Sequence, residues 1–189
     1  MTGYYMLECM VPLGQTAYTL SGYPSIDGIE SWTLGSRFAR APERPIVVRW
    51  APDTQGLKKS FYDATVPLMR RELVEALRVA GVDNLDCYDA LIEQPETGDV
   101  DSGYLAVNVV GAIGAADLTK SAWADLSGRR RIDMDFDSLA IKPLAPREAL
   151  LFRLAECTSG LVIHARVKAQ LEANGGFGLS FVDPGDWIG

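Results

Sequence analysis

The sequence has few of the residues on which most catalytic and metal centres depend. It contains one histidine, His164, and three cysteines, Cys9, Cys87 and Cys157, which stand far apart. An odd and scattered set of cysteines argues against a disulfide framework and against a zinc site. A reducing cytoplasm is the compartment that suits this set best. We therefore expect no metal and no cofactor, and we predict that the protein is not an enzyme.

Long apolar runs are also missing. None approaches the roughly 20 residues that a membrane-spanning helix requires, and the first residues have neither the basic start nor the small-residue cleavage site of a signal peptide. We therefore expect no membrane partner. Of the 189 residues, 48% are hydrophobic and 23% are charged. This composition, without an internal repeat or a linker, predicts one folded domain over residues 1–189.

Positive charge is absent from a long central stretch. No lysine or arginine occurs from Val79 to Thr119, a stretch that holds eight acidic residues, whereas the whole chain has a net charge of −7. Nucleic-acid binding requires the opposite sign, so we expect no nucleic-acid partner. A concentrated negative surface suits a basic protein partner. The alternative interpretation is a solvated loop that maintains solubility.

Two groups of acidic residues are candidates for contact with such a partner. The first group is Asp86, Asp89, Glu93, Glu96, Asp99 and Asp101, and the second is Asp133, Asp135 and Asp137. The second group begins like a calcium-binding loop, but Ser138 and Leu144 stand where that loop requires glycine and glutamate. Its aspartates alternate with apolar residues, a pattern typical of the exposed face of a half-buried strand.

Three further patterns could carry chemistry, and each has a simpler explanation. His164 lies among apolar residues near Cys157, and no serine stands in a nucleophile elbow, so we interpret His164 as structural. Gly111 and Gly114 do not form a dinucleotide-binding fingerprint, and we interpret them as turn glycines. Nothing in the composition of residues 83–101 would bury a carboxylate and raise its pKa for acid–base catalysis. A small carboxylate-based enzyme or ligand-binding domain stays an alternative, as does an adaptor subunit.

The residue pattern predicts more strands than helices. The best-marked helix covers residues 61–84, where apolar residues recur at helical spacing, Thr65 and Pro67 suit the first turn, and Gly81 suits the end. A second helix is expected at 166–172, and a short helical turn at 121–126. Strands are expected at 4–11, 46–50, 85–92, 104–113, 132–136, 150–155 and 177–182. Because strands do not alternate regularly with helices, we predict an α+β fold, with a mainly antiparallel or mixed sheet and a few helices packed on it.

Five stretches, taken in order, resemble a family of bacterial immunity proteins. They are Trp32-x-x-Gly35-x-x-Phe38; Pro67-Leu68 leading to Leu77 and Gly81-Val82-Asp83-Asn84; Tyr104 with Asn108-Val109-Val110-Gly111; Leu151-Phe152-Arg153-Leu154; and Gly178-Leu179-Ser180-Phe181. The family is the eleventh immunity family catalogued in polymorphic-toxin systems, and it was formerly labelled a domain of unknown function.

The resemblance implies a cytoplasmic protein that binds and neutralises a toxin encoded beside it. It brings no catalytic residue and does not identify the toxin. We expect the matched residues to form the scaffold: Trp32 and Phe38 would bury large areas, Gly35 would permit a backbone shape that a side chain opposes, Asn108 would bridge backbone groups within a strand, and Arg153 would pair with an acid. The two acidic groups lie outside the matched pattern, so their contact with a basic toxin surface is our inference.

Overall fold

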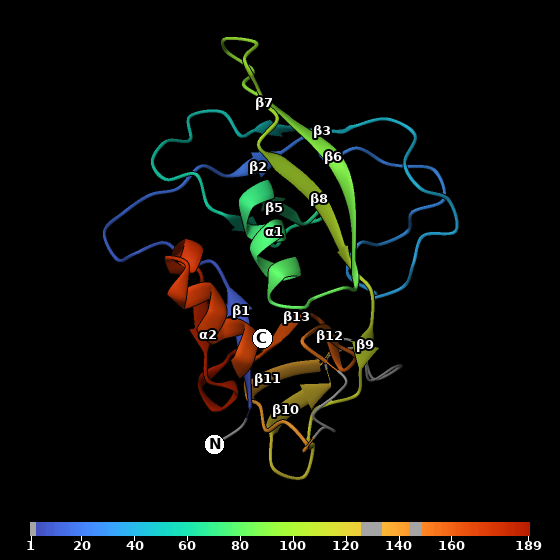
Figure 1. Ribbon diagram of the computed structural model, residues 1–189, viewed down its shortest axis with the longest axis vertical. Helices are drawn as coiled ribbons and strands as arrows, with labels where there is room; N and C mark the ends of the chain where they lie inside the picture. Colours follow the sequence, from blue (N-terminus) through green and yellow to red (C-terminus); the bar gives the residue numbers. More distant parts are fainter. Residues whose placement is uncertain (1–2, 126–133, 144–148) are drawn as a thin grey trace.

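The computed structural model describes residues 3–125, 134–143 and 149–189, and it has the predicted α+β fold (Figure 1). The two α-helices of these residues are α1 (Arg71–Val79) and α2 (Ala165–Ala173), and short 3-10 helices occupy Gly176–Gly178 and Pro184–Asp186. The strands are β1 (Tyr4–Glu8), β2 (Leu20–Ser21), β3 (Ile46–Trp50), β4 (Phe61–Tyr62), β5 (Leu68–Arg70), β6 (Leu85–Glu93), β7 (Val100–Asp101), β8 (Tyr104–Val109), β9 (Ala112–Ile113), β10 (Ala122–Asp125), β11 (Met134–Ser138), β12 (Leu151–Leu154), β13 (Cys157–His164) and β14 (Ser180–Val182).

Within the described residues the strands form three sheets. A seven-stranded sheet has the order β2-β3-β6-β8-β5-β4, with β7 paired to β6; a five-stranded sheet has the order β14-β1-β13-β12-β9; and β10 pairs with β11. The pairs β3–β6 and β9–β12 are parallel, whereas the other strand pairs are antiparallel. In Figure 1 the seven-stranded sheet lies above the five-stranded one, and β10 and β11 lie at the bottom.

One apolar core is shared by both large sheets and both α-helices. Leu73 and Leu77 of α1 and Val167 of α2 pack in it with Val107 of β8 and Ile163 of β13, and each of these side chains is at most 1% exposed. Burial of this much apolar area is the main force that holds the helices against the strands. A second core covers the other face of the five-stranded sheet and receives β11, and a third covers the other face of the seven-stranded sheet.

The predicted helix at residues 61–84 begins ten residues too early. Residues 61–62 and 68–70 are β4 and β5, and the helix covers only Arg71–Val79. Thr65 and Pro67, expected in its first turn, lie between the two strands, and the Pro67 carbonyl accepts a hydrogen bond from the Val107 N–H at 2.9 Å. Strand pairing with distant residues therefore overrides the local helix signals. The predicted end is confirmed, since Gly81 follows with a φ of +94°.

The predicted strand at residues 104–113 is two strands in different sheets. β8 ends at Val109, the chain turns at Gly111 with a φ of +122°, and β9 joins the five-stranded sheet. This short segment therefore carries the chain from one sheet to the other. The side chain of Asn108 does not bridge its own strand as expected: its amide donates instead to the Ser36 carbonyl at 2.8 Å.

The region that includes the second acidic group contains one confirmed and one wrong prediction. Residues 122–125 are a strand, β10, rather than the expected helical turn, because they pair antiparallel with β11; residue 126, at the end of that turn, is outside the described residues. The alternation along β11 is confirmed, with Met134 and Phe136 buried and Asp135 and Asp137 exposed. Asp133, the remaining member of the group, also lies outside the described residues.

The crossing between the sheets is fixed by a close approach of two glycines. The Gly111 N–H donates to the Gly35 carbonyl at 2.7 Å, and the Gly111 carbonyl accepts from the Arg153 N–H at 3.0 Å. Gly35 has a φ of +70°, and a Cβ placed there would lie 2.8 Å from backbone atoms of Gly111 and Ala112. Only glycine fits at this position, as the sequence predicted, because a side chain would meet rigid backbone.

We predict that Gly35→Ala destabilises the fold more than Gly28→Ala. Gly28 has a similar φ of +79°, but nothing lies within 4 Å of its added Cβ. Gly28→Ala should cost about 1 kcal/mol of unfolding free energy, from backbone strain alone. Gly35→Ala should cost roughly 3 kcal/mol, because overpacking is added to the strain. Urea unfolding measures both values, and equal losses would contradict the close approach.

Candidate functional site

The acidic stretch forms a projecting hairpin. β6 runs outward, turns, and returns as β7, and the turn is closed by two backbone hydrogen bonds, from Gln94 N–H to the Asp99 carbonyl and from Gly98 N–H to the Gln94 carbonyl, both at 2.8 Å. Residues 95–100 are all exposed. Figure 1 shows this tip at one end of the longest axis of the molecule.

Most of the first acidic group forms ion pairs. Sequence reasoning noted that the stretch has no positive charge of its own, but the fold brings cations to it from residues 37–71. The pairs are Asp86 with Arg37 at 3.9 Å, Asp89 with Arg71 at 2.6 Å, Glu93 with Arg49 at 3.2 Å and Asp101 with Lys58 at 2.9 Å. The sides and base of the hairpin are therefore less negative than the sequence indicates.

Glu96 and Asp99 are the two members of the group that form no ion pair within the described residues. Both lie at the tip and are exposed. Asp99 accepts a hydrogen bond from the Thr97 hydroxyl at 2.8 Å, and Glu96 accepts one from the Gln94 amide. The uncompensated negative charge of the hairpin is thus concentrated at its tip.

The base of the hairpin is held by the carboxylate of Asp101. Burial raises the pKa of this group, but hydrogen bonds from the Lys58 ammonium at 2.9 Å and the Gly103 N–H at 2.9 Å outweigh burial, so the pKa is lowered. The same ammonium lies 5.2 Å from the centre of the Trp50 ring. The charged Asp101 therefore fixes the position from which the tip projects.

The second acidic group lies far from the first. Asp135 and Asp137 are on β11, at the opposite end of the longest axis from the hairpin tip (Figure 1). The structure therefore does not bring the two predicted groups together into one surface. A partner that covers the tip would leave Asp135 and Asp137 in solvent.

His164 has the position that the sequence predicted, at a junction between strand and helix. Its Nδ1 accepts a hydrogen bond from the Arg166 N–H at 3.0 Å and so caps α2, and its ring packs edge-on against Tyr4 with 5.1 Å between ring centres.

Among the described residues, no three His, Cys, Asp or Glu side chains are grouped so that they could hold a metal ion. No helix of the described residues is long and apolar enough to cross a membrane.

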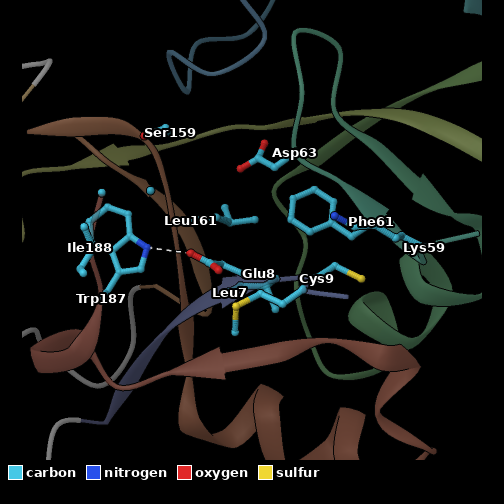
Figure 2. A pocket seen from close by; sticks show the side chains of 13 residues that line it. Leu7, Glu8, Cys9, Lys59, Phe61, Asp63, Ser159, Leu161, Trp187 and Ile188 are labelled. Carbon is cyan, nitrogen blue, oxygen red and sulfur yellow. Dashed lines mark hydrogen bonds between the residues drawn. The ribbon is translucent and has the colours of Figure 1, made fainter. Parts of the chain in front are cut away.

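A cleft of about 350 Å³ was missed by sequence reasoning (Figure 2). It lies where the end of β1 meets the chain after β4, the start of β13 and the residues around Trp187. In Figure 2 the carboxyl group of Glu8 lies between Phe61 and Trp187, and Asp63 lies above it in this view. These residues are far apart in the sequence and belong to no common motif, so no local signal could have assembled them.

One wall of the cleft rests on a buried ion pair. Arg153 is fully buried, and its Nη1 and Nη2 donate to the two Asp63 carboxylate oxygens at 3.0 and 2.9 Å. Nη1 also donates to the Ser159 carbonyl at 3.1 Å, whereas Nε has no partner. The pairing of Arg153 with an acid was predicted, but its partner was not. The pair joins β12 of one large sheet to the segment after β4 of the other.

Glu8 and Trp187 form another part of the lining. The Trp187 indole N–H donates to Glu8 Oε1 at 2.9 Å, drawn as a dashed line in Figure 2. Trp187 is only 5% exposed, so this contact holds the Glu8 carboxylate in place. Two anchored carboxylates, those of Glu8 and Asp63, therefore line the cleft.

Comparison with known proteins adds no family to this description. No family model matches the sequence, and no curated protein matches it. The resemblance to the immunity family therefore rests on the five matched stretches.

We predict that removing Asp63 from the ion pair lowers the free energy of unfolding more than removing Arg153. Asp63→Ala leaves the Arg153 charge buried without its counter-ion and should lower the free energy of unfolding by about 3 kcal/mol. Arg153→Met should cost only about 1 kcal/mol, because methionine fills the buried space and Asp63, which is 30% exposed, can be hydrated. The double variant should cost less than the two single losses added together. Urea unfolding checks this, and a larger loss for Arg153→Met would contradict it.

Proposed function

We propose that this protein is an immunity protein that protects a bacterium from a toxin used in competition between bacteria. It binds the cognate toxin in the cytoplasm and occludes it, one molecule to one, without a chemical step of its own. The proposal rests on the resemblance in the five matched stretches and on the geometry of the hairpin.

The positions of the matched residues support their role as scaffold. Four of the five stretches meet at the crossing between the two large sheets. Gly35 contacts Gly111 there, and the Asn84 amide donates to the Val110 carbonyl at 2.7 Å and to the Leu151 carbonyl at 2.9 Å. The matched pattern therefore describes a structural junction, and it leaves the hairpin tip free for recognition.

The observation that carries the proposal is the exposed tip with its two uncompensated acids. Glu96 and Asp99 are exposed and form no ion pair within the described residues, so their field extends into solvent and attracts a basic surface. Val100, which is 53% exposed, adds an apolar side chain beside them. The hydrogen bonds that close the turn fix its shape before binding, so less conformational entropy is lost in the complex.

Co-expression tests the proposal directly. The toxic C-terminal domain that the proposal expects beside this gene is expressed in a sensitive host with and without the protein. We expect cells that express the toxin domain to survive only when they also express this protein. We also expect the two purified proteins to form a one-to-one complex. Equal killing with and without the protein would refute the proposal and favour the adaptor or ligand-binding alternatives.

We predict that the tip controls the rate of association. The variant Glu96→Gln/Asp99→Asn should slow association with the toxin by about tenfold at low salt and reduce its salt dependence. The matched control Asp135→Asn/Asp137→Asn removes the same charge at the opposite end of the molecule and should change the rate little. Stopped-flow fluorescence measures both rates. If the control slows association as much as the tip variant, the tip is not the contact.

A further inference from the structure

We infer that the cleft between Phe61 and Trp187 binds the guanidinium group of an arginine side chain from the partner protein. This inference rests on the proposed function, because it names a basic group that the partner would insert. It concerns residues outside both predicted acidic groups and outside the hairpin.

The acceptor atoms favour a cation with several N–H donors. A carboxylate can accept about four hydrogen bonds. Glu8 accepts one, from Trp187 on Oε1, and Oε2 accepts none from the described residues; Asp63 accepts one on each oxygen, from Arg153. Both groups therefore keep acceptor positions, and both line the cleft. A planar guanidinium with five donors in a fork matches two such carboxylates.

The remaining walls suit the rest of an arginine side chain. Phe61 and Leu161 are 1% and 2% exposed and give the cleft apolar sides, against which an aliphatic stem can pack. At about 350 Å³, the cleft is near the lower end of the range for ligand pockets, roughly 300 Å³, and suits one side chain better than a large cofactor.

Lys59 also lines the cleft. Its ammonium lies 5.6 Å from the centre of the Tyr62 ring. In the view of Figure 2, Lys59 is on the Phe61 side of the cleft, opposite Trp187. Within the described residues neither Lys59 nor any other cation forms an ion pair with Glu8, so its carboxylate can attract the positive charge of a ligand.

The rim indicates a macromolecule as the source of the cation. Met10 and Ile188 both border the cleft and are 55% and 75% exposed. A small cationic molecule inside the cleft would leave these side chains in water, whereas a protein surface around an inserted arginine would cover them. The arginine would then be a central anchor, with an apolar rim that excludes water.

The first test uses isolated probes and needs no toxin. N-acetyl-arginine amide is titrated into the ¹⁵N-labelled protein, and the indole N–H resonance of Trp187, assigned with the Trp187→Phe variant, is followed. We expect saturable shifts with a Kd in the millimolar range, on the order of what one side chain provides. N-acetyl-citrulline amide, the neutral isostere, should bind at least about tenfold more weakly. Equal shifts with both probes, or none with the arginine probe, would overturn the inference.

The second test assigns the cation to the partner. Glu8→Gln keeps an oxygen to accept from Trp187 while it removes the charge, so we expect it to fold normally. It should weaken both the arginine probe and the toxin about tenfold, through faster dissociation. The control Glu96→Gln should leave probe binding unchanged. A toxin affinity unchanged by Glu8→Gln would overturn the partner assignment while the immunity function stands. Failure of the wild-type protein to bind toxin would instead refute the proposed function, and with it the partner as source, although the probe titration would still report the cleft's preference for a cation.

Discussion

The buried ion pair between Arg153 and Asp63 is the contact on which the relation of the two large sheets depends. Arg153 has lost all contact with water, so its charge is tolerable only with Asp63 in place. Arg153 is in β12 of the five-stranded sheet, and Asp63 directly follows β4 of the seven-stranded sheet. A different packing of the two sheets would leave the guanidinium buried without its counter-ion. A hydrophobic pair would be satisfied by many arrangements, whereas this one has a single bidentate geometry. The pair thus selects one arrangement, and it also sets a wall of the cleft.

The crossing of the chain from β8 to β9 adds a second constraint at nearby residues. The Gly111 carbonyl accepts from the backbone N–H of Arg153, so the residue that forms the ion pair is also bonded to the crossing. Asn84 joins the same junction by donating to both sides of it. These contacts involve backbone groups and a side-chain amide that would cost free energy if buried without partners. This explains why Gly111, Asn84 and Arg153 stand among the otherwise largely apolar residues of the quoted stretches.

The sequence predicted those parts of the fold that local periodicity determines. Residues 46–50 form the expected strand, the alternation in β11 is confirmed, and the first helix ends just before Gly81, as expected. The start of that helix was wrong because Thr65 and Pro67 are good helix signals in isolation, and only pairing with residues 104–106 makes β5 a strand. The cleft was beyond prediction for the same reason: Glu8, Asp63 and Trp187 meet only after both sheets have packed.

Electrostatics shows the same division between local and distant information. The sequence shows how many acidic residues lie in residues 79–119. Which of them form ion pairs depends on the fold, because the cations that pair with them come from residues 37–71. Exposed pairs of this kind add little stability, yet they cancel much of the field along the hairpin sides. The remaining field comes from the tip. A partner is steered by uncompensated charge and held by desolvated contacts. In the proposed function, therefore, the tip serves the encounter with a basic protein and the cleft its retention.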